Sequence, residues 1–171
     1  CDKIIPGMLM GAIRVDIPAI MIPGGPMKPG KLGEEFESIT LTDMREYIGR
    51  YRAGEISRET LSQLEQHACP GPGSCSMMGT ANTMSCVAEA LGMSLPGAGT
   101  APAVSEERKR LAYDTGARII DLLTEDVKPS TLITRESIIN AARVAMALGG
   151  STNTFLHLPA LSYEAGIGIQ L

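Results

Sequence analysis

The sequence predicts a helix-rich α/β domain in which helices flank a small, mainly parallel sheet. Apolar residues recur at helical spacing through most of the chain. One uninterrupted apolar run, residues 19–22, lies between Pro18 and Pro23 and is typical of a short strand buried on both faces, as in a parallel sheet. The 171 residues, 44% of them hydrophobic, suffice for one domain with a real core.

The first half of the chain alternates helix, strand and loop. A helix is predicted around Pro6, with Met8, Leu9, Ala12 and Ile13 on one face. After the strand at 19–22, residues 23–26 (PGGP) form a loop at its carboxyl end, where ligands bind in open α/β sheets. The same residue types also form ordinary turns. A second short strand is predicted at residues 38–41.

Helices dominate the remainder, and their ends are marked by capping residues. A helix is predicted to resume near Ser76, after the Pro/Gly-rich stretch 69–75, and the last helix should be kinked by Pro159. The predicted N-caps are Thr42, Ser57, Ser105, Thr134 and Ser151, and the predicted stops are Gly54, Gly92, Gly149, Gly150 and Gly166.

Charge and composition exclude several functional classes. The chain has 15 Lys and Arg against 19 Asp and Glu, a net charge of −4, which argues against a nucleic-acid-binding face. No apolar run reaches the ~18 residues of a membrane helix, and no signal peptide is visible. Four cysteines are sparse for a disulfide framework, so we expect reduced thiols in the cytoplasm. Because the chain opens on Cys1 rather than Met, we expect it to be a piece of a longer protein.

The first three residues place a thiol, a carboxylate and an amine side by side in the sequence: Cys1, Asp2 and Lys3. The thiolate suits iron or zinc, whereas the carboxylate suits magnesium or manganese. The Lys3 ammonium has only donors, so it can ligate a metal only when deprotonated or carboxylated. The alternative is a terminal tripeptide with no functional role.

Cys69 and Cys75 flank a Pro/Gly loop that exposes backbone amides. Cys75 falls where a helix is predicted to begin, a position that stabilises a thiolate and suits a metal or cluster ligand. The spacing of the two cysteines is not that of common zinc or ferredoxin sites. Cys86, inside the following helix, is interpreted as a small buried hydrophobe.

A third candidate is Ser151-Thr152-Asn153, which follows Gly149 and Gly150. A helix that starts there can bind a carboxylate or phosphate through its backbone amides, which makes these three residues candidate substrate ligands. The alternative is a helix break followed by an ordinary N-cap. His157, within an apolar helix, is interpreted as a satisfied core histidine rather than a metal ligand.

Taken together, these segments resemble one family, the dihydroxy-acid dehydratase / 6-phosphogluconate dehydratase family. The resemblance is carried by CDKIIPGMLMGA at residues 1–12, CPGPGSCSMMGTANTM at 69–84, PAVSEE at 102–107 and ALGGSTNT at 147–154. It is nearer to the dihydroxy-acid branch, and a paralogue acting on sugar acids remains an alternative.

The resemblance implies an iron–sulfur cluster, of two-iron or four-iron type, held by three cysteines, with one open iron acting as a Lewis acid on the departing hydroxyl. By the same resemblance, Cys1 and Cys75 are two of the cluster ligands. Asp2 and Lys3, the latter as its carbamate, are ligands of Mg²⁺, which stabilises the enolate. Cys69 is not a consistent ligand in the family, and we retain it only as an additional candidate ligand.

The resemblance also implies that essential parts lie outside this chain: the third cluster cysteine, a further magnesium carboxylate and the serine proposed as general base. Residues 1–171 would be the central part of an amino-terminal cluster-bearing domain, inactive alone and without an intact cluster. The full-length protein would be a cytoplasmic, homodimeric lyase of branched-chain amino-acid biosynthesis that converts a 2,3-dihydroxy acid to a 2-keto acid.

Two hypotheses from other functional classes remain open at this point. The first is a non-catalytic module in which Cys1, Cys69 and Cys75 bind zinc. The second is a plain helical interaction domain, which predicts that Cys1, Asp2 and Cys75 lie far apart.

Overall fold

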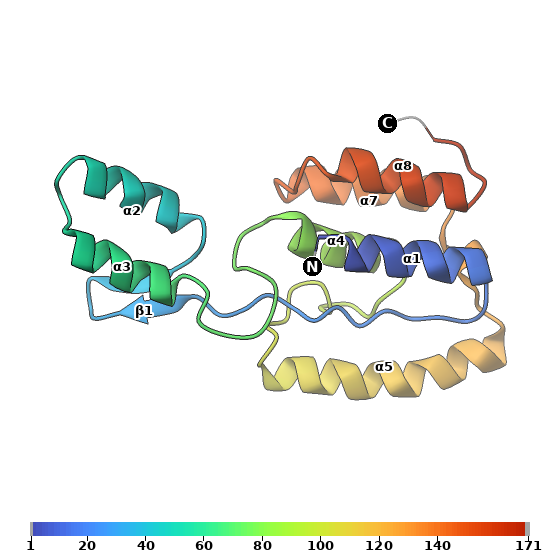
Figure 1. The fold of residues 1–171 in the computed structure, drawn as a ribbon. Coiled ribbons are helices and arrows are strands. Elements are labelled where there is room, and N and C mark those ends of the chain that lie inside the picture. The colour runs from blue at the N-terminus through green and yellow to red at the C-terminus, as the bar shows by residue number, and fades with distance from the viewer. Residues whose placement is uncertain (1, 170–171) are drawn as a thin grey trace.

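The computed structural model describes residues 2–169, which form eight helices and two strands (Figure 1). In chain order the elements are α1 (Ile4–Val15), β1 (Gly30–Leu32), β2 (Phe36–Ile39), α2 (Asp43–Arg52), α3 (Arg58–His67), α4 (Thr80–Ala90), α5 (Glu106–Glu125), α6 (Pro129–Leu132), α7 (Arg135–Ala147) and α8 (Thr154–Glu164).

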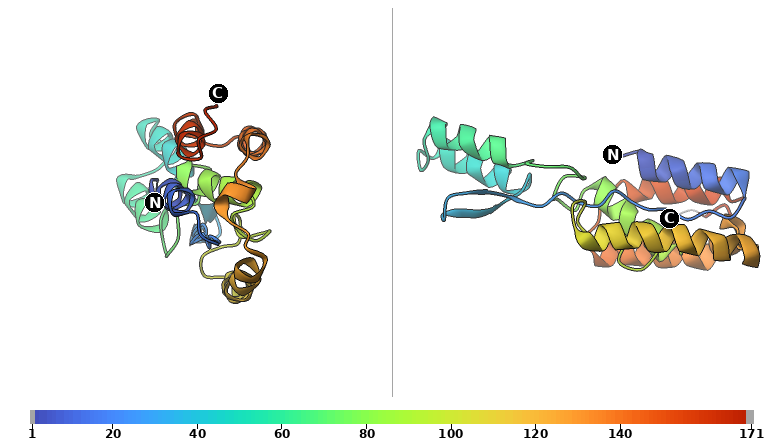
Figure 2. Two further views of the ribbon diagram at one scale, coloured as in Figure 1. Left: turned by 90° about the vertical axis from the view of Figure 1, so that its right-hand side faces the viewer. Right: turned by 90° about the horizontal axis from the view of Figure 1, so that it is seen from below.

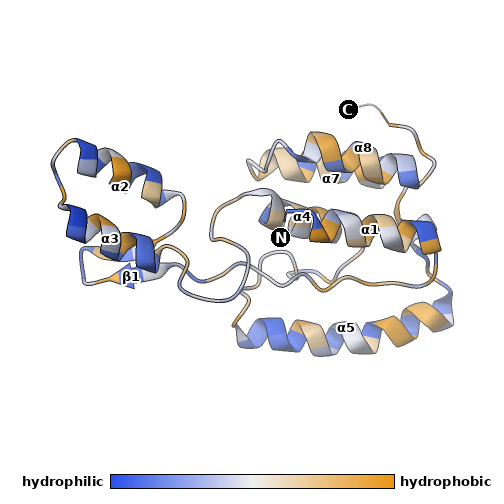
Figure 3. Ribbon diagram, viewed as in Figure 1, coloured by the Kyte–Doolittle hydropathy of each residue, from blue (hydrophilic) through white to orange (hydrophobic). Residues whose placement is uncertain are grey.

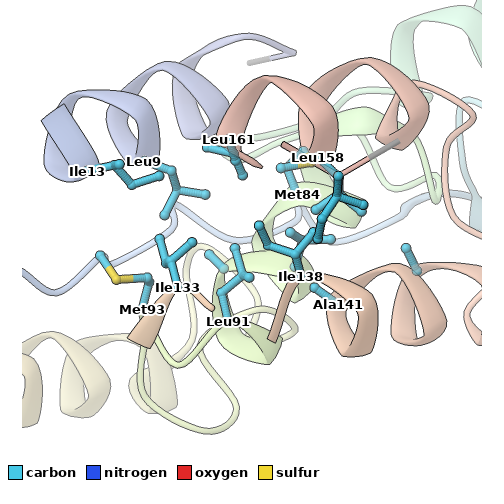
Figure 4. Packing of buried hydrophobic residues seen from close by; sticks show 14 residues of the cluster. Leu9, Ile13, Met84, Leu91, Met93, Ile133, Ile138, Ala141, Leu158 and Leu161 are labelled. Carbon is cyan, nitrogen blue, oxygen red and sulfur yellow. The ribbon is translucent and has the colours of Figure 1, made fainter. Parts of the chain in front are cut away.

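The body of the molecule is built around α4. This helix packs against α7 and α1, and α8 packs against α1 and α7. Every residue from 81 to 88 is buried, so α4 is enclosed on all sides. The core it shares with its neighbours is aliphatic and methionine-containing (Figure 4). Its fully buried members include Leu9, Met84, Met93, Ile138, Leu158 and Leu161.

Four helices of the body start at the same end. In Figure 1 the N-termini of α1, α4, α5 and α8 all lie toward the left of the body, while α7 runs in the opposite direction. Because each helix carries a partial positive charge at its N-terminus, this end of the body is favourable for negative charge.

Residues 30–68 form a separate lobe that projects from the body (Figures 1 and 2). It contains β1, β2, α2 and α3 and has its own small core, in which Phe36 meets Tyr47 edge-on with ring centroids 5.4 Å apart. Gly30 lies directly against the carbonyl of His67, where a Cβ would collide with the backbone. This close approach joins the start of β1 to the end of α3.

The helix-rich α/β class predicted from the sequence is confirmed, but the sheet is not parallel. Within residues 2–169, β1 and β2 pair antiparallel, and parallel pairing is limited to two isolated bridges, Met21 with Ser94 and Pro26 with Ser74. The predicted strand at 19–22 is therefore reduced to one bridge, in which the Met21 amide donates to Met93. The flanking prolines lack the amide that a longer ladder needs.

Three of the five predicted N-caps are confirmed. The side chains of Ser57, Ser105 and Thr134 each accept the amide three residues on. Thr42 makes no such bond; instead the Asp43 carboxylate accepts the Thr40 amide at 2.8 Å, which ends β2 before residue 40. The last helix begins at Thr154 rather than directly after Ser151, and Pro159 lies inside it.

Much apolar surface remains uncovered on this chain. Figure 3 shows that α5 begins with hydrophilic residues and that hydrophobic residues are more frequent in its second half. Ile120 and Leu123 on α5 and Phe155 and Leu156 on α8 are more than half exposed. Among the described residues, no helix combines the length and the apolar character that a membrane span requires.

Candidate functional site

The Asp2 carboxylate lies where three helices begin. Asp2 precedes α1, and Asn153 at the start of α8 places its Nδ2 3.4 Å from the Asp2 Oδ1. The same Nδ2 donates to Thr80 Oγ1, in the first residue of α4, at 2.8 Å. The starts of α1, α4 and α8 are thus joined by side chains around one carboxylate.

Charge at this point favours the ionised form of Asp2. Lys3 Nζ lies 2.6 Å from Asp2 Oδ2. The hydrogen bond from Lys3, followed by that from Thr80, lowers the pKa of Asp2 to about 2. The carboxylate is therefore ionised at neutral pH and, since its side chain is 46% exposed, it is accessible as a hard oxygen donor.

Of the three predicted substrate-binding residues, two join the hydrogen-bond network around Asp2 and Thr80, and one is exposed. Ser151 Oγ lies 3.0 Å from Thr80 Oγ1, and the Ser151 amide donates to Thr83 Oγ1 at 2.9 Å. Asn153 contacts Asp2 as described, whereas Thr152 is exposed. The structure therefore brings Asn153 to Asp2, and Ser151 to Thr80, which itself bonds to Asp2.

Gly150 makes this approach possible. A Cβ there would lie 2.7 Å from Thr83 Cγ2 and 2.8 Å from the Ala145 carbonyl, closer than real contacts allow. Gly149, which precedes it, has a positive φ of 62° that disfavours other residues. The glycine pair is thus required by the packing of the 149–153 loop on α4.

Cys75 is half-buried in the loop that leads into α4. The residue before it, Ser74, lines a cavity of about 270 Å³ together with Ile4 and Ile5 of α1 and Gly24 and Gly25 of the 23–26 loop. The beginning of α1, the 23–26 loop and the cysteine loop therefore border one cavity.

The helix-start explanation for Cys75 is wrong, because α4 begins at Thr80 rather than near Ser76. Gly79 is the N-cap, and residues 74–79 form an irregular loop. Cys86 is buried as predicted, and burial, with a smaller effect of Glu89, raises the pKa of its thiol. Cys69 is exposed, and Cys1 lies outside the described residues.

Comparison with known proteins decides the family. The sequence profile of the dihydroxy-acid/6-phosphogluconate dehydratase N-terminal family matches residues 1–171. The chain belongs to this family. It is similar over its whole length to the dihydroxy-acid dehydratases of Caldicellulosiruptor bescii (56% identity), Caldicellulosiruptor saccharolyticus (54%) and Syntrophobacter fumaroxidans (53%). It spans 31%, 31% and 30% of the lengths of these relatives.

The donors of this dehydratase-family chain fit part of a metal site. Asp2 offers a hard carboxylate whose ionised form is stabilised by Lys3 and Thr80, and Cys75 offers a soft, half-buried thiol next to Ser74, which lines the cavity. Within residues 2–169, however, no three His, Cys, Asp or Glu side chains are grouped closely enough to hold a metal ion.

His157 differs from the core histidine expected from the sequence. It is buried, with 4% of its surface exposed, but its Nε2 has no hydrogen-bond partner among residues 2–169. Burial, together with the nearby charge of Lys3, lowers the pKa of His157, while Asp2 opposes this effect. His157 lies one turn after Asn153 on α8, so it faces the same side of that helix.

Sequence analysis missed three polar residues of α4 that organise the candidate site: Thr80, Asn82 and Thr83. All three lie in the 69–84 segment that carries the family resemblance. Polar side chains in the otherwise apolar α4 were the available signal. The partners of Thr80 and Thr83 come from residues about 70 positions away in the chain and could not be inferred from spacing, whereas Asn82 bonds to residues 74, 75 and 77 of the preceding loop.

Proposed function

We propose that this chain is the central part of the amino-terminal domain of a longer hydro-lyase, which dehydrates a 2,3-dihydroxy carboxylic acid to a 2-keto acid in branched-chain amino-acid biosynthesis. Family membership and the similarity to dihydroxy-acid dehydratases support it. The observation that carries the proposal is the ionised Asp2 carboxylate, which is hydrogen-bonded to Thr80 at the start of α4 and to Asn153 at the start of α8.

In this proposal Cys1 and Cys75 are two of three cysteine ligands of an iron–sulfur cluster, and Asp2 and carbamylated Lys3 are ligands of Mg²⁺. When bound, these groups supply a Lewis acid for the departing hydroxyl and a cation for the negative charge of the substrate. Lys3 contributes only after its ammonium loses a proton, because the ammonium has no lone pair. It donates to Asp2 in the structure.

The chain's own polar groups would bind and orient the acid. The N-terminal ends of α1, α4 and α8 stabilise the negative charge of a substrate carboxylate and of an enolate. Thr152, exposed at the same loop as Ser151 and Asn153, offers a hydroxyl that a substrate can reach. Asn153 holds Asp2 in place through its side-chain amide.

The remainder of the longer protein would complete the site. It would supply the third cluster cysteine, a further magnesium carboxylate and the general base. We therefore expect residues 1–171 alone to be inactive and to hold no intact cluster. The full-length enzyme would act in the cytoplasm as a homodimer.

The test uses the longer protein, purified without oxygen and analysed for iron, sulfide, magnesium and zinc. Activity is measured on a branched 2,3-dihydroxy acid and, in parallel, on a sugar acid. We expect bound iron and sulfide, formation of the branched 2-keto acid, and loss of both cluster and activity in Cys75→Ser. Asp2→Asn should retain iron but lose activity, and Cys69→Ser is the matched control that retains both.

Three results would contradict or redirect the proposal. Full activity in Cys75→Ser would remove Cys75 from the site. Stoichiometric zinc that depends on Cys69 and Cys75, with no iron or sulfide, would favour the metal–thiolate module. Faster turnover of the sugar acid would assign the chain to a sugar-acid dehydratase of the same family.

A further inference from the structure

Asn82, in the first turns of α4, makes hydrogen bonds on both sides of Cys75. Its Nδ2 donates to the Cys75 carbonyl at 2.9 Å and to the Met77 carbonyl at 2.6 Å. Its Oδ1 accepts from Ser74 Oγ at 2.5 Å. The side chain is only 8% exposed. We propose that Asn82 is a positioning residue that fixes how Cys75 presents its thiol to the metal group; this rests on the proposed function.

An amide is the side chain suited to this task. It has two donors and an acceptor oxygen in one plane, and here both functions are used by a single loop. The bonds to the carbonyls of residues 75 and 77 and to the hydroxyl of residue 74 hold the backbone before and after the cysteine. The direction of the Cys75 Cα–Cβ bond is therefore set by a group on a rigid helix.

The opposite side of the cysteine loop is also anchored. The Ser74 amide donates to the Gly25 carbonyl at 3.0 Å, and the Met27 amide donates to the Ser74 carbonyl at 2.8 Å. Gly73 allows this approach, since a Cβ there would lie 2.6 Å from the Met27 nitrogen. Cys75 is thus held between α4 and the 23–27 segment.

Arg108 in turn holds the loop at residues 23–26 through hydrogen bonds to backbone carbonyls. The guanidinium donates to the Pro23 carbonyl at 2.6 Å, to the Ala98 carbonyl at 2.8 Å and to the Ala101 carbonyl. Arg108 is 7% exposed and lies in the first turn of α5. The Gly25 carbonyl that receives Ser74 therefore belongs to a loop with little freedom to move.

Asn82 is not needed to hold α4 itself. Met84, Val87 and Ala88 on the same helix are fully buried in the aliphatic core. Substitution of Asn82 should leave α4 packed while the 74–77 loop loses its attachment. This separation between the helix and the loop makes a positioning role distinguishable from a purely structural one.

The experiment uses the longer protein, reconstituted with iron and sulfide without oxygen, and the variant Asn82→Asp. The carboxylate keeps the acceptor for Ser74 but loses the two N–H donors to the Cys75 and Met77 carbonyls. We expect iron to be removed by a chelator about 10- to 100-fold more readily than from the wild type, as for other groups that orient a metal ligand. The visible and electron paramagnetic resonance spectra of the cluster should shift as well.

Two further variants separate misfolding from mispositioning. Ser74→Ala removes one bond to Asn82 and should show the same effects in weaker form, which provides a test if Asn82→Asp does not fold. Thr115→Val is the matched control, because Thr115 is equally buried but bonds only to Leu111 within α5. It should retain iron and spectra like those of the wild type.

A second readout does not depend on the cluster. In the iron-free protein, the rate of Cys75 alkylation by iodoacetamide, measured by peptide mass spectrometry, should change in Asn82→Asp while that of Cys69 does not. Wild-type iron retention, spectra and alkylation in the variant would overturn the positioning role alone. A wild-type protein that binds neither iron nor sulfide would overturn both this role and the proposed function.

Discussion

At the scale of single residues, the surroundings of Asp2 determine the charge and the position of its carboxylate. In the sequence it is one acid between a cysteine and a lysine. In the structure its charge is maintained by Lys3 and by polar groups from two helices that lie far along the chain. An exposed ion pair such as Asp2–Lys3 contributes little to stability by itself, so its value lies in keeping an ionised oxygen at a defined place.

Asp16 provides a pH-dependent test at this scale. Its carboxylate accepts the Ser130 amide at 2.9 Å and the Ser130 hydroxyl at 2.8 Å. The bond from the Ser130 amide, then that from its hydroxyl, lowers the pKa of Asp16. The stabilisation is therefore present above the unfolded-state pKa and is lost as pH falls through the lower folded-state value.

We expect Asp16→Asn to be less stable than the wild type at neutral pH, with the difference shrinking as the pH falls below about 4. Asn tolerates the positive φ of 49° at this position, so the backbone is not the cause. Thermal unfolding over a pH series measures the effect. Parallel pH profiles for the two proteins would contradict it.

A pair of glycines tests the packing of the 149–153 loop. Gly150→Ala should destabilise the protein by about 1–3 kcal/mol, because the new methyl group overlaps Thr83 and the Ala145 carbonyl. Gly11→Ala, in α1 with no atom within 4 Å of the added Cβ, should instead stabilise it by about 0.5–1 kcal/mol. Urea unfolding of both variants gives the comparison, and equal effects would contradict the close approach.

At the scale of elements, α5 does more than cover the body. Its first turn carries Arg108, whose guanidinium joins the 23–26 loop to the loop before α5. A buried arginine that donates to three carbonyls satisfies backbone groups that no sheet ladder satisfies. The loops at the base of the lobe thereby acquire a fixed shape without regular secondary structure.

Arg108→Lys should destabilise the protein by about 2–3 kcal/mol, since a single ammonium cannot reach all three carbonyls in the guanidinium geometry. Arg110→Lys, on the exposed side of α5, is the control and should change stability by less than about 0.5 kcal/mol. Chemical unfolding of the two variants measures the difference. Similar losses in both would show that the buried bonds of Arg108 contribute little.

At the scale of the whole molecule, residues 2–169 contain two hydrophobic cores. The larger one joins α1, α4, α7 and α8, and the smaller one lies inside residues 30–68. Only two extended segments connect the lobe to the body, and the cysteine loop is part of one of them (Figure 2). The cysteine loop therefore lies at the junction of the two parts.

Because the two cores are separate, we expect a cavity in one core to destabilise mainly the elements that surround that core. Leu64→Ala, in the lobe, should cost about 2–5 kcal/mol and increase hydrogen exchange in residues 30–68 while α4 and α7 stay protected. Leu161→Ala, in the body, should reduce protection in α4 and α7 instead. Hydrogen exchange with peptide resolution distinguishes the two, and a uniform response in both variants would show a single cooperative unit.

Local patterns in the sequence predicted much of the fold. Ser57, Ser105 and Thr134 cap their helices through bonds to amides three residues away, so neighbouring residues suffice to specify them. Gly54, Gly92 and Gly166 end helices with positive φ for the same local reason. The motifs at 1–12, 69–84 and 147–154 predicted the family correctly.

Tertiary contacts decided the rest. The partners of Asp2 on α4 and α8, the bond of the 149–153 loop to α4 and the bonds of Arg108 to the 23–26 loop join groups that are distant in the chain. Asn82 and Arg108 were not recognised because the carbonyls that they bind are presented by loops without a periodic pattern. The sequence by itself determined helices, caps and family, because these depend on neighbours; the geometry around Cys75 and Asp2 depends on buried polar bonds that only the folded chain brings together.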